Sequence, residues 1–446
     1  MPDPKEVKKR ETETELGAVK GMRDIVAEDF FAFQGFFEKA AEIALYYGFS
    51  PIETPILEHE SLFTRAVGEG TDIVSKEMYA LKTRGGDHLA LRPEFTAPIM
   101  RAYVERGLQS QPQPVSLYSF GPLFRHDKPQ RGRYRQFYQF DLEMLGTPKS
   151  IADAMVIKLM LLILEEAGLQ NLNLRINSIG DKECRGNYRR ELANYYKKNL
   201  RTICPDCRER LKTNPLRVLD CKDPRCQEVK ASAPASISYL CGPCKAHFKE
   251  VLEYLDEMGI EYEIDNTLVR GLDYYTRTVF EIKEPVASES AATISGESAA
   301  TAPLAVAGGG RYDYLARALG HKKDVPAVGG AIGVDRIMLS PQFVPHHPRI
   351  VKKPKAFFIQ LSFDAKLKSM AAIEILRKAR IPVAQSISKD SLGAQLAIAE
   401  KMQVPYTIIL GQKEAIDNTV IVRNMQNRSQ DVVPLAKLGE YVKGLK

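Results

Sequence analysis

The chain has 446 residues, of which 44% are hydrophobic and 27% charged, and its formal net charge is +7 at pH 7. This composition excludes a wholly disordered chain, and the length predicts two or three domains. No apolar run reaches the roughly 18 to 20 residues of a membrane helix, and the N-terminal segment lacks the apolar stretch of a signal peptide. We therefore expect a soluble cytoplasmic protein that does not contact a membrane.

The N-terminal half predicts a mixture of helices and strands. Residues 1–16 are mostly polar and predict a solvated tail, whereas apolar residues recur at helical spacing over 24–47. The strand-like runs are HLALRPEFTAPI, SLYSFGPLF and QFYQFDLEML, and further helices are predicted at 97–106 and 151–168. This mixture predicts an α+β body built on an antiparallel sheet.

The segment 121–143 predicts a β-hairpin with a strongly basic tip. Because side chains alternate along a strand, one face of the returning strand carries Arg135, Phe137, Gln139, Asp141 and Glu143. Guanidinium groups pair with phosphate, a ring can stack on a base, and an amide and a carboxylate can hold an amine. The hairpin therefore indicates a site for a nucleotide and an amino acid, and a solvated surface hairpin is the alternative. The cations of the tip are Arg125, His126, Lys128, Arg131, Arg133 and Arg135.

The seven cysteines lie in the basic region 181–250. Cys204 and Cys207 form a CPDC motif and Cys241 and Cys244 form a CGPC motif, and two such pairs around one ion would make a tetrahedral thiolate site for structural zinc. The sequence leaves the ligand set open, because two further cysteines compete for the ion and free thiols in a reducing compartment are the alternative to a metal. The rival ligands are Cys221 and Cys226, and Cys184 is interpreted as an ordinary buried thiol.

The C-terminal part differs from the body in composition. Residues 284–303 are low in complexity and predict a surface loop. Prolines at 341, 345, 348 and 354 predict a linker, after which strand-like runs alternate with helical segments. We therefore predict a separate α/β domain over 355–446.

Five segments carry a resemblance to a known family. They are LRPEFT at 91–96, the hairpin, LVRGLDYYTRTVFEI at 268–282, AGGGRYD at 307–313 and GGAIGVDRIML at 329–339. In their order they resemble the class II aminoacyl-tRNA synthetases, and RGLDYY and GGRYD resemble the histidyl-tRNA synthetase family. The resemblance implies a catalytic domain over 17–345, with 181–250 inserted in it, and an anticodon-binding domain over 355–446. The TPILE segment with Pro55 resembles the first motif of the class and implies a homodimer.

The resemblance also implies the reaction and its residues. The family joins histidine to its cognate tRNA(His) through a histidyl-adenylate, with ATP as substrate and Mg²⁺ on the phosphates, and no protein base is assigned to the transfer step. Arg125 and Arg270 are implied as the catalytic cations at the reacting phosphate, because planar guanidinium forks can bridge carboxylate and phosphate oxygens. Lys128 and Gln130 are implied contacts to the acceptor end of the tRNA. The remaining ATP-binding residues are Arg133, Phe137 and Arg336, and the histidine-binding residues are Glu94, Thr96, Gln139, Glu143, Tyr275 and Tyr312.

Two departures from the family pattern affect the expected rim of the pocket: Phe95 and Tyr314 stand where glycine is usual. Two other functions remain as alternatives. One is a non-catalytic regulatory paralogue of histidine biosynthesis, which lacks the C-terminal domain and usually loses the arginines. The other is a zinc-containing nucleic-acid-binding protein. The presence of Arg125, Arg270 and Arg336 favours the enzyme.

Overall fold

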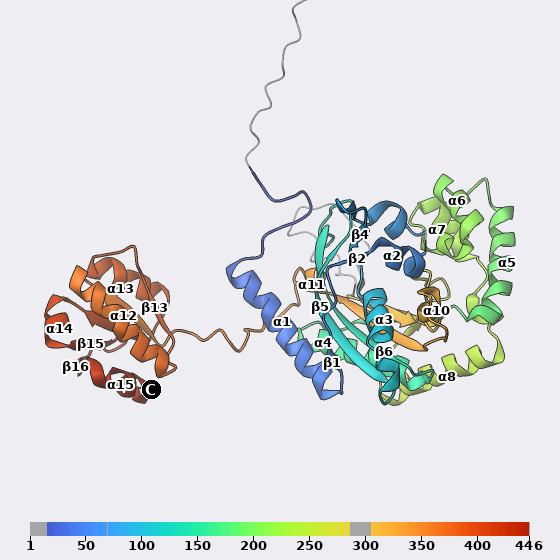
Figure 1. Ribbon diagram of the computed structural model, residues 1–446. Coiled ribbons are helices and arrows are strands. Elements are labelled where there is room, and N and C mark those ends of the chain that lie inside the picture. Colours follow the sequence, from blue (N-terminus) through green and yellow to red (C-terminus); the bar gives the residue numbers. More distant parts are fainter. Residues whose placement is uncertain (1–15, 69, 286–304, 446) are drawn as a thin grey trace, which may run out of the picture. The chain divides into compact units, whose positions relative to one another are not determined.

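The computed structural model describes residues 16–68, 70–285 and 305–445, and divides the chain into two compact units, Met1–Pro348 and Arg349–Lys446 (Figure 1). The tail predicted at 1–16 and the loop predicted at 284–303 lie almost entirely outside the described residues. No described helix is both long and apolar enough to cross a membrane. The predicted domain boundary at 355 stays a prediction.

An eight-stranded sheet forms the centre of the first unit, with strand order β1-β5-β6-β11-β10-β9-β7-β8. The pairs from β5 to β7 are antiparallel, and the two short edge strands pair in parallel. This sheet, with its helices, confirms the predicted α+β class. The strands are β1 (Ser50–Pro51), β5 (Val115–Phe124), β6 (Gln136–Leu145), β7 (Asn173–Ser178), β8 (Glu263–Ile264), β9 (Thr276–Lys283), β10 (Ala305–Arg311) and β11 (Ala327–Gly333).

Helices cover one face of this sheet. Phe36 and Ile157 from two of these helices belong to the same buried cluster as Phe140 and Leu142 of β6. The helix predicted over 24–47 is α1, and the one predicted over 151–168 is α4; their apolar residues face the sheet, which explains the helical spacing. The helices of this layer are α1 (Ala27–Tyr46), α4 (Ser150–Glu166) and α8 (Gly242–Glu257).

The opposite face of β6 borders a second cluster. Phe137 and Leu145 of β6 pack there with Phe95, Ile99 and Tyr103. Residues 137 and 145 thus share a face that 140 and 142 do not, so the alternation predicted for this strand is present. The other helices on this side are α2 (Glu60–Val67), α3 (Thr96–Glu105), α10 (Leu315–Ala318), the π-helix η1 (Ile73–Glu77) and the 3-10 helix η2 (Leu108–Ser110). A small sheet of β2 (Leu57–His59), β4 (His88–Leu91) and β3 (Ala80–Lys82) also lies here, and α11 (Val334–Ile337) follows β11.

The inserted region is helical and has its own core, in which Tyr188, Leu192 and Tyr196 pack with Leu219. It leaves the body after β7 and returns through α8, and Figure 1 shows its helices gathered on the side of the unit away from α1. Its elements are α5 (Lys182–Lys198), α6 (Pro205–Thr213), η3 (Pro215–Asp220), α7 (Pro224–Ala231) and η4 (Ser236–Tyr239).

The second unit is a five-stranded sheet of order β13-β12-β14-β15-β16, parallel for the first three strands and antiparallel for the rest. Phe358 and Ile408 enter one buried cluster and Phe357 and Ile409 another, so apolar side chains cover both faces. The strands are β12 (Ala356–Gln360), β13 (Val383–Gln385), β14 (Tyr406–Leu410), β15 (Thr419–Asn424) and β16 (Gln430–Pro434). The helices are α12 (Phe363–Lys378), α13 (Leu392–Lys401), α14 (Gln412–Asp417), η5 (Leu435–Lys437) and α15 (Leu438–Gly444).

Candidate active site

Two predicted histidine-binding residues meet at the N-terminus of α3. Glu94 is 4% exposed, and its carboxylate accepts hydrogen bonds from the backbone N–H groups of Thr96 (2.8 Å) and Ala97 (3.0 Å). The orphan amides of a helix start thus hold the carboxylate in place. Burial nevertheless raises the pKa of Glu94, against the lowering effect of these two amides.

Glu143 of β6 lies beside this helix start. The Thr96 hydroxyl donates to its Oε1 (2.6 Å) and the Tyr312 hydroxyl donates to its Oε2. Glu143 is fully buried, and burial raises its pKa to about 8. Gly329, its partner on β11, is required here because a Cβ at that position would lie 1.5 Å from Oε2 of Glu143. The structure therefore joins Glu94, Thr96, Glu143 and Tyr312 in one hydrogen-bonded group.

Asp141 adds a third buried carboxyl group that the sequence placed on this face without assigning it a role. It is 2% exposed, and its Oδ1 is buried with no hydrogen-bond partner among the residues that the structure describes. Burial raises its pKa well above the ordinary value, and the nearby charges of Glu143 and Glu94 raise it further. We call Glu94, Asp141 and Glu143 the acidic cluster. A cationic ligand would relieve their mutual repulsion.

Aromatic side chains wall the acidic cluster. The ring centroid of Tyr274 lies 4.7 Å from that of Tyr275 and 5.7 Å from that of Tyr312, and the Tyr274 hydroxyl donates to Glu94 (3.4 Å). Tyr275 and Tyr312 were predicted here, whereas Tyr274 was missed although it is adjacent in the sequence to Tyr275. Burial raises the pKa of Tyr275 to about 12, so its hydroxyl stays protonated and can donate.

Four arginines from three segments, two of them from the hairpin, form a basic group next to the acidic cluster. Burial is the main influence that lowers the pKa of Arg336, to about 10, and the nearby charges of Arg133, Arg125 and Arg270 lower it further. We call these four residues the arginine cluster. Such a concentration of cations is stable when an anion with several charges lies between them.

Arg125 links the two clusters. It follows β5 at the start of the hairpin tip, and its Nε donates to the carbonyl of Pro93 (2.9 Å), directly before Glu94. Its guanidinium carbon lies 5.2 Å from the centroid of the Phe137 ring. Burial lowers the pKa of Arg125, although the acidic neighbours Glu77 and Glu94 oppose this.

Arg270 approaches from the segment before β9. Its Nη1 pairs with Oε1 of Glu281 on β9 (2.9 Å), a residue that the sequence did not single out. Burial lowers the pKa of Arg270, but its neighbours, led by Tyr275 and Glu281, outweigh burial and leave the pKa raised. A Cβ at Gly308 would lie 2.8 Å from Nη1 of Arg270, so the glycine-rich strand β10 leaves the space that this side chain occupies.

The remaining predicted residues line the hairpin. Arg133 pairs with Asp127 (3.0 Å), and Gln139 pairs in register with Gly121 and Gly333 on the two neighbouring strands. Lys128 and Gln130 are exposed at the tip. Of the two departures, Phe95 is buried and its ring centroid lies 4.4 Å from the guanidinium carbon of Arg92. The ring centroid of Tyr314 lies 4.5 Å from the ammonium nitrogen of Lys182.

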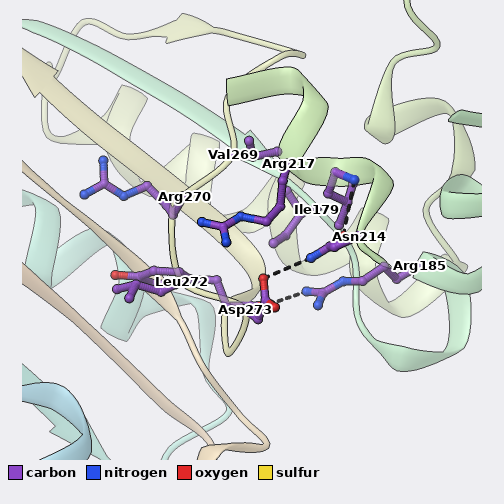
Figure 2. A pocket seen from close by; sticks show the side chains of 10 residues that line it. Ile179, Arg185, Asn214, Arg217, Val269, Arg270, Leu272 and Asp273 are labelled. Carbon is purple, nitrogen blue, oxygen red and sulfur yellow. Dashed lines mark hydrogen bonds between the residues drawn. The ribbon is translucent and has the colours of Figure 1, made fainter. Parts of the chain in front are cut away.

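A small pocket lies between the inserted region and the Arg270 segment (Figure 2). Arg217 of η3 donates to the carbonyls of Gly271 (3.0 Å) and Gly70 (3.0 Å), and Asn214 donates to Asp273 (2.9 Å). The inserted region thus holds the segment that carries Arg270 and Tyr275. The sequence could not reveal these contacts, because they join residues more than 50 positions apart.

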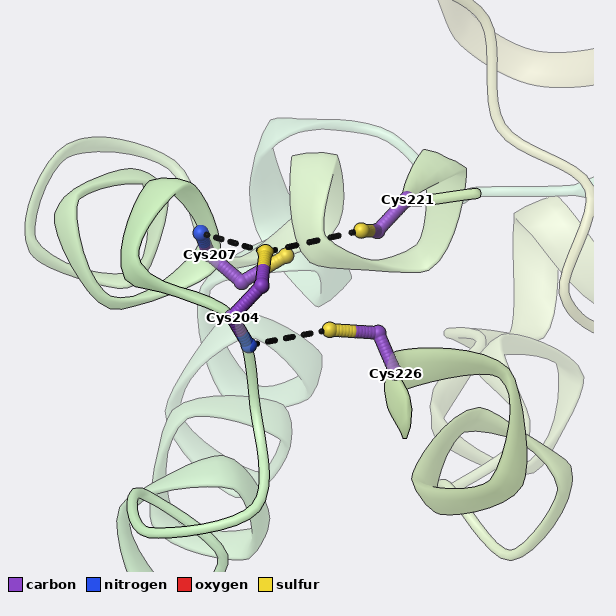
Figure 3. Close-up of side chains that lie close together, drawn as sticks. All are labelled: Cys204, Cys207, Cys221 and Cys226. Atoms are coloured by element: carbon purple, nitrogen blue, oxygen red, sulfur yellow. Dashed lines mark hydrogen bonds between the residues drawn. The ribbon is translucent and has the colours of Figure 1, made fainter. Parts of the chain in front are cut away.

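The cysteines are grouped differently from the first of the predicted pairings. Cys204 and Cys207 meet Cys221 and Cys226, with the four sulfur atoms within 4.8 Å of one another (Figure 3), whereas Cys241 and Cys244 lie in another group. The combination of the two CxxC motifs around one ion is therefore wrong. The reason is that Cys241 and Cys244 begin α8, which belongs to the body, while the inserted core brings the starts of α6 and α7 together.

Comparisons with known proteins show which proteins this chain is similar to. A family model described as histidyl-tRNA synthetase matches residues 21–180 and 228–337, and one described as an anticodon binding domain matches 355–445. A histidine–tRNA ligase of Dehalococcoides mccartyi is 42% identical over 419 residues, which are 94% of this chain and 97% of the relative. A histidine–tRNA ligase of Desulforamulus reducens is 40% identical over 425 residues, which are 95% of this chain and 98% of that relative. The crystal structure of apo histidyl-tRNA synthetase of S. aureus has a TM-score of 0.76 and 30% identity, covering 96% of this chain and 100% of that one.

Proposed function

The chain belongs to the histidyl-tRNA synthetase family, and we propose that it is a histidine–tRNA ligase, which activates histidine with ATP and transfers it to tRNA. One observation carries the proposal: the acidic cluster and the arginine cluster adjoin each other at Arg125. An amino acid presents a cation and a carboxylate, and ATP presents a row of anions. The acidic cluster matches the cation of the amino acid, and the arginine cluster matches its carboxylate and the phosphates of ATP.

The activation step brings two anions together, because the carboxylate of histidine attacks the α-phosphorus of ATP and pyrophosphate leaves. We assign Arg125 and Arg270 to the charge that develops on phosphorus, since fixed guanidinium groups stabilise such charge without reorganisation. The pair of Arg270 with Glu281 and the contact of Arg125 with the Pro93 carbonyl support fixed positions for both. We assign Arg133, Phe137 and Arg336 to the rest of the nucleotide.

Mg²⁺ is expected with ATP, and its usual ligands are one or two carboxylates together with phosphate oxygens. Glu281 offers a carboxylate at the arginine cluster, where its Oε1 pairs with Arg270 (2.9 Å) and its Oε2 with Lys283 (2.8 Å). The ion would neutralise phosphate charge. Glu281 would hold it, while the arginines orient the phosphates.

The acidic cluster supports recognition of histidine rather than an apolar amino acid. We assign Glu94, Thr96 and Gln139 to the α-ammonium group, and Glu143, Tyr275 and Tyr312 to the imidazole. A carboxylate oxygen that accepts one O–H group can still accept an N–H group. An apolar side chain would leave Glu143 buried without that partner, which costs binding free energy.

For the tRNA, we assign the exposed hairpin tip, with Lys128 and Gln130, to the acceptor end, and the second unit to the anticodon. A homodimer that acts in the cytoplasm is also part of the proposal. The segment around the first motif supports self-association because it exposes apolar side chains: Tyr46 is 84% exposed, Ile56 44% and Leu57 45%. Light scattering on purified protein tests the dimer.

We propose structural zinc at the cluster of Cys204, Cys207, Cys221 and Cys226. All four side chains are buried, and backbone N–H groups donate to three of the sulfurs: Cys207 N to Cys204 (3.4 Å), Cys204 N to Cys226 (3.2 Å) and Asp223 N to Cys221 (3.4 Å). Such donors stabilise thiolates, which are the form that binds zinc.

The test of the function is histidine-dependent exchange of pyrophosphate into ATP by purified protein, with glutamine and arginine as control amino acids. We expect exchange with histidine only. A protein that binds histidine but shows no exchange at saturating ATP and Mg²⁺ would instead fit the regulatory alternative, against which the arginine cluster and the anticodon-binding unit argue.

A further inference from the structure

A second group of potential metal ligands lies where the inserted region joins the body. Asp181, Cys184, Cys241 and Cys244 place one ligand atom each within 4.8 Å of the others. Asp181 and Cys184 flank the start of α5, which leaves the body, and Cys241 and Cys244 flank the start of α8, which returns to it. Helices 60 residues apart in sequence therefore meet at these four side chains.

The spacing of these residues is that of two metal-binding knuckles. Asp181 and Cys184 form a DKEC motif and Cys241 and Cys244 a CGPC motif, each with two residues between its ligands. Around a tetrahedral ion with bonds of about 2.0 to 2.3 Å, neighbouring ligand atoms lie about 3.3 to 3.8 Å apart. The distances from Oδ1 of Asp181 to the sulfurs of Cys184 (3.6 Å) and Cys241 (4.0 Å) are close to this range.

The surroundings are built to hold these groups. A Cβ at Gly180 would lie 2.5 Å from the sulfur of Cys184, so only glycine leaves that sulfur its place. Asp181 is 4% exposed and Cys244 is fully buried, so water has little access to these two side chains and cannot readily take the place of a metal ion as their partner. Arg277 pairs with Oδ2 of Asp181 (3.4 Å) and offsets part of the negative charge of four anionic ligands.

We propose that this group is a second zinc site, separate from the one at Cys204, Cys207, Cys221 and Cys226. Three thiolates and one carboxylate favour zinc over magnesium or calcium, which prefer oxygen ligands alone. A zinc ion there joins the first turns of α5 and α8. The ion also fixes the position of Asp181, which pairs with Arg277. Because Arg277 lies two residues after Tyr275, the zinc ion holds the first residues of the inserted region close to the proposed histidine-binding residues.

Zinc content is the direct test, and it does not depend on activity. Full-length protein purified without added zinc is expected to contain about two zinc ions per chain. Cys244→Ser should lower the content to about one, and the matched variant Cys207→Ser in the other cluster should do the same. A content of one ion that Cys244→Ser leaves unchanged would overturn the second site.

Alkylation of the native wild-type protein tests the second zinc site without a substitution, so the result does not depend on whether a variant folds. We expect Cys184, Cys241 and Cys244 to resist N-ethylmaleimide until a chelator removes zinc, and then to react as the ion is released. Peptide mass spectrometry reads each cysteine separately. Reaction of these three thiols without zinc release, or a disulfide between two of them, would contradict the proposal.

Discussion

At the scale of single residues, the site is defined by buried ionisable groups whose charges the protein neutralises only in part. Within the described part of the chain, Asp141 has a buried carboxyl oxygen without a hydrogen-bond partner, and Arg336 lies among three other arginines. Arrangements of this kind cost folding free energy and persist at functional sites because a ligand supplies the missing charge. Histidine and ATP would supply opposite charges at the two ends of one continuous site.

The role of Arg270 leads to the first prediction. Arg270→Ala should lower kcat/KM for pyrophosphate exchange by about 100-fold or more, because it removes a cation that acts on the charge of the transition state. Arg317→Ala is the matched control, since Arg317 is 57% exposed and pairs only with Asp324 among the bonds described for it. Both variants should keep the thermal unfolding temperature of the wild type within a few degrees. Equal exchange rates in the two variants would refute the role.

The raised pKa of Glu143 gives a prediction about pH. The carboxyl group ionises with a pKa of about 8 in the folded protein and near 4.5 when unfolded. Its contribution to stability is therefore complete below pH 4.5 and is lost as pH rises to 8, at about 1.4 kcal/mol per pH unit in between. Glu143→Gln cannot ionise, so the unfolding temperature of wild type should fall relative to the variant from pH 5.5 to 7.5. Parallel temperature profiles for the two proteins would show that Glu143 is already ionised in the folded state.

At the scale of elements, local patterns in the sequence predicted what depends on local geometry. The alternation along β6 placed Phe137, Gln139 and Glu143 on one face, and the spacing of apolar residues gave α1 and α4 to within a few residues. The partners of the cysteines could not be predicted this way, because four short helices separate Cys204 from Cys241 and their packing decides which sulfurs meet. Asp141 was assigned no role and Tyr274 was missed for a related reason: burial in a cluster of acidic and aromatic side chains is a property of the assembled fold.

The inserted region acts on the site through η3, and this is testable. Arg217 is 9% exposed and its guanidinium bonds two carbonyls, including that of Gly271 next to Arg270. Arg217→Ala leaves both carbonyls unsatisfied, at a cost of about 1 to 3 kcal/mol. We expect faster hydrogen exchange over 268–275 and a drop in kcat for pyrophosphate exchange of about tenfold.

The control for this variant is Arg190→Ala on α5, which removes an exposed arginine from the same inserted region. It should change neither hydrogen exchange over 268–275 nor kcat. A positioning role also predicts partial recovery in Arg217→Lys, because the single ammonium nitrogen of a lysine can replace one of the two guanidinium nitrogens that donate to the carbonyls. If Arg217→Ala lowers kcat without changing hydrogen exchange in that segment, the contact does not act by positioning Arg270.

At the scale of the whole molecule, the two units have separate cores. The buried clusters of the first unit end before the linker, and those of the second contain only residues from 356 onward. Every predicted residue for histidine and ATP lies in the first unit. Activation and tRNA recognition should therefore be separable by truncation.

The last prediction concerns a truncated protein that lacks residues 349–446, the complete second unit. Because the buried clusters of the first unit consist only of residues before 349, the truncated protein should fold and retain histidine-dependent pyrophosphate exchange to within about threefold of the full chain. Aminoacylation of tRNA(His) should fall by about 100-fold, which corresponds to about 2.7 kcal/mol of lost binding to the anticodon side. The measurement is exchange and charging on the same preparations, with circular dichroism to verify folding. Equal losses in both reactions would mean that the second unit supports the active site itself, and undiminished charging would remove its assignment to the anticodon.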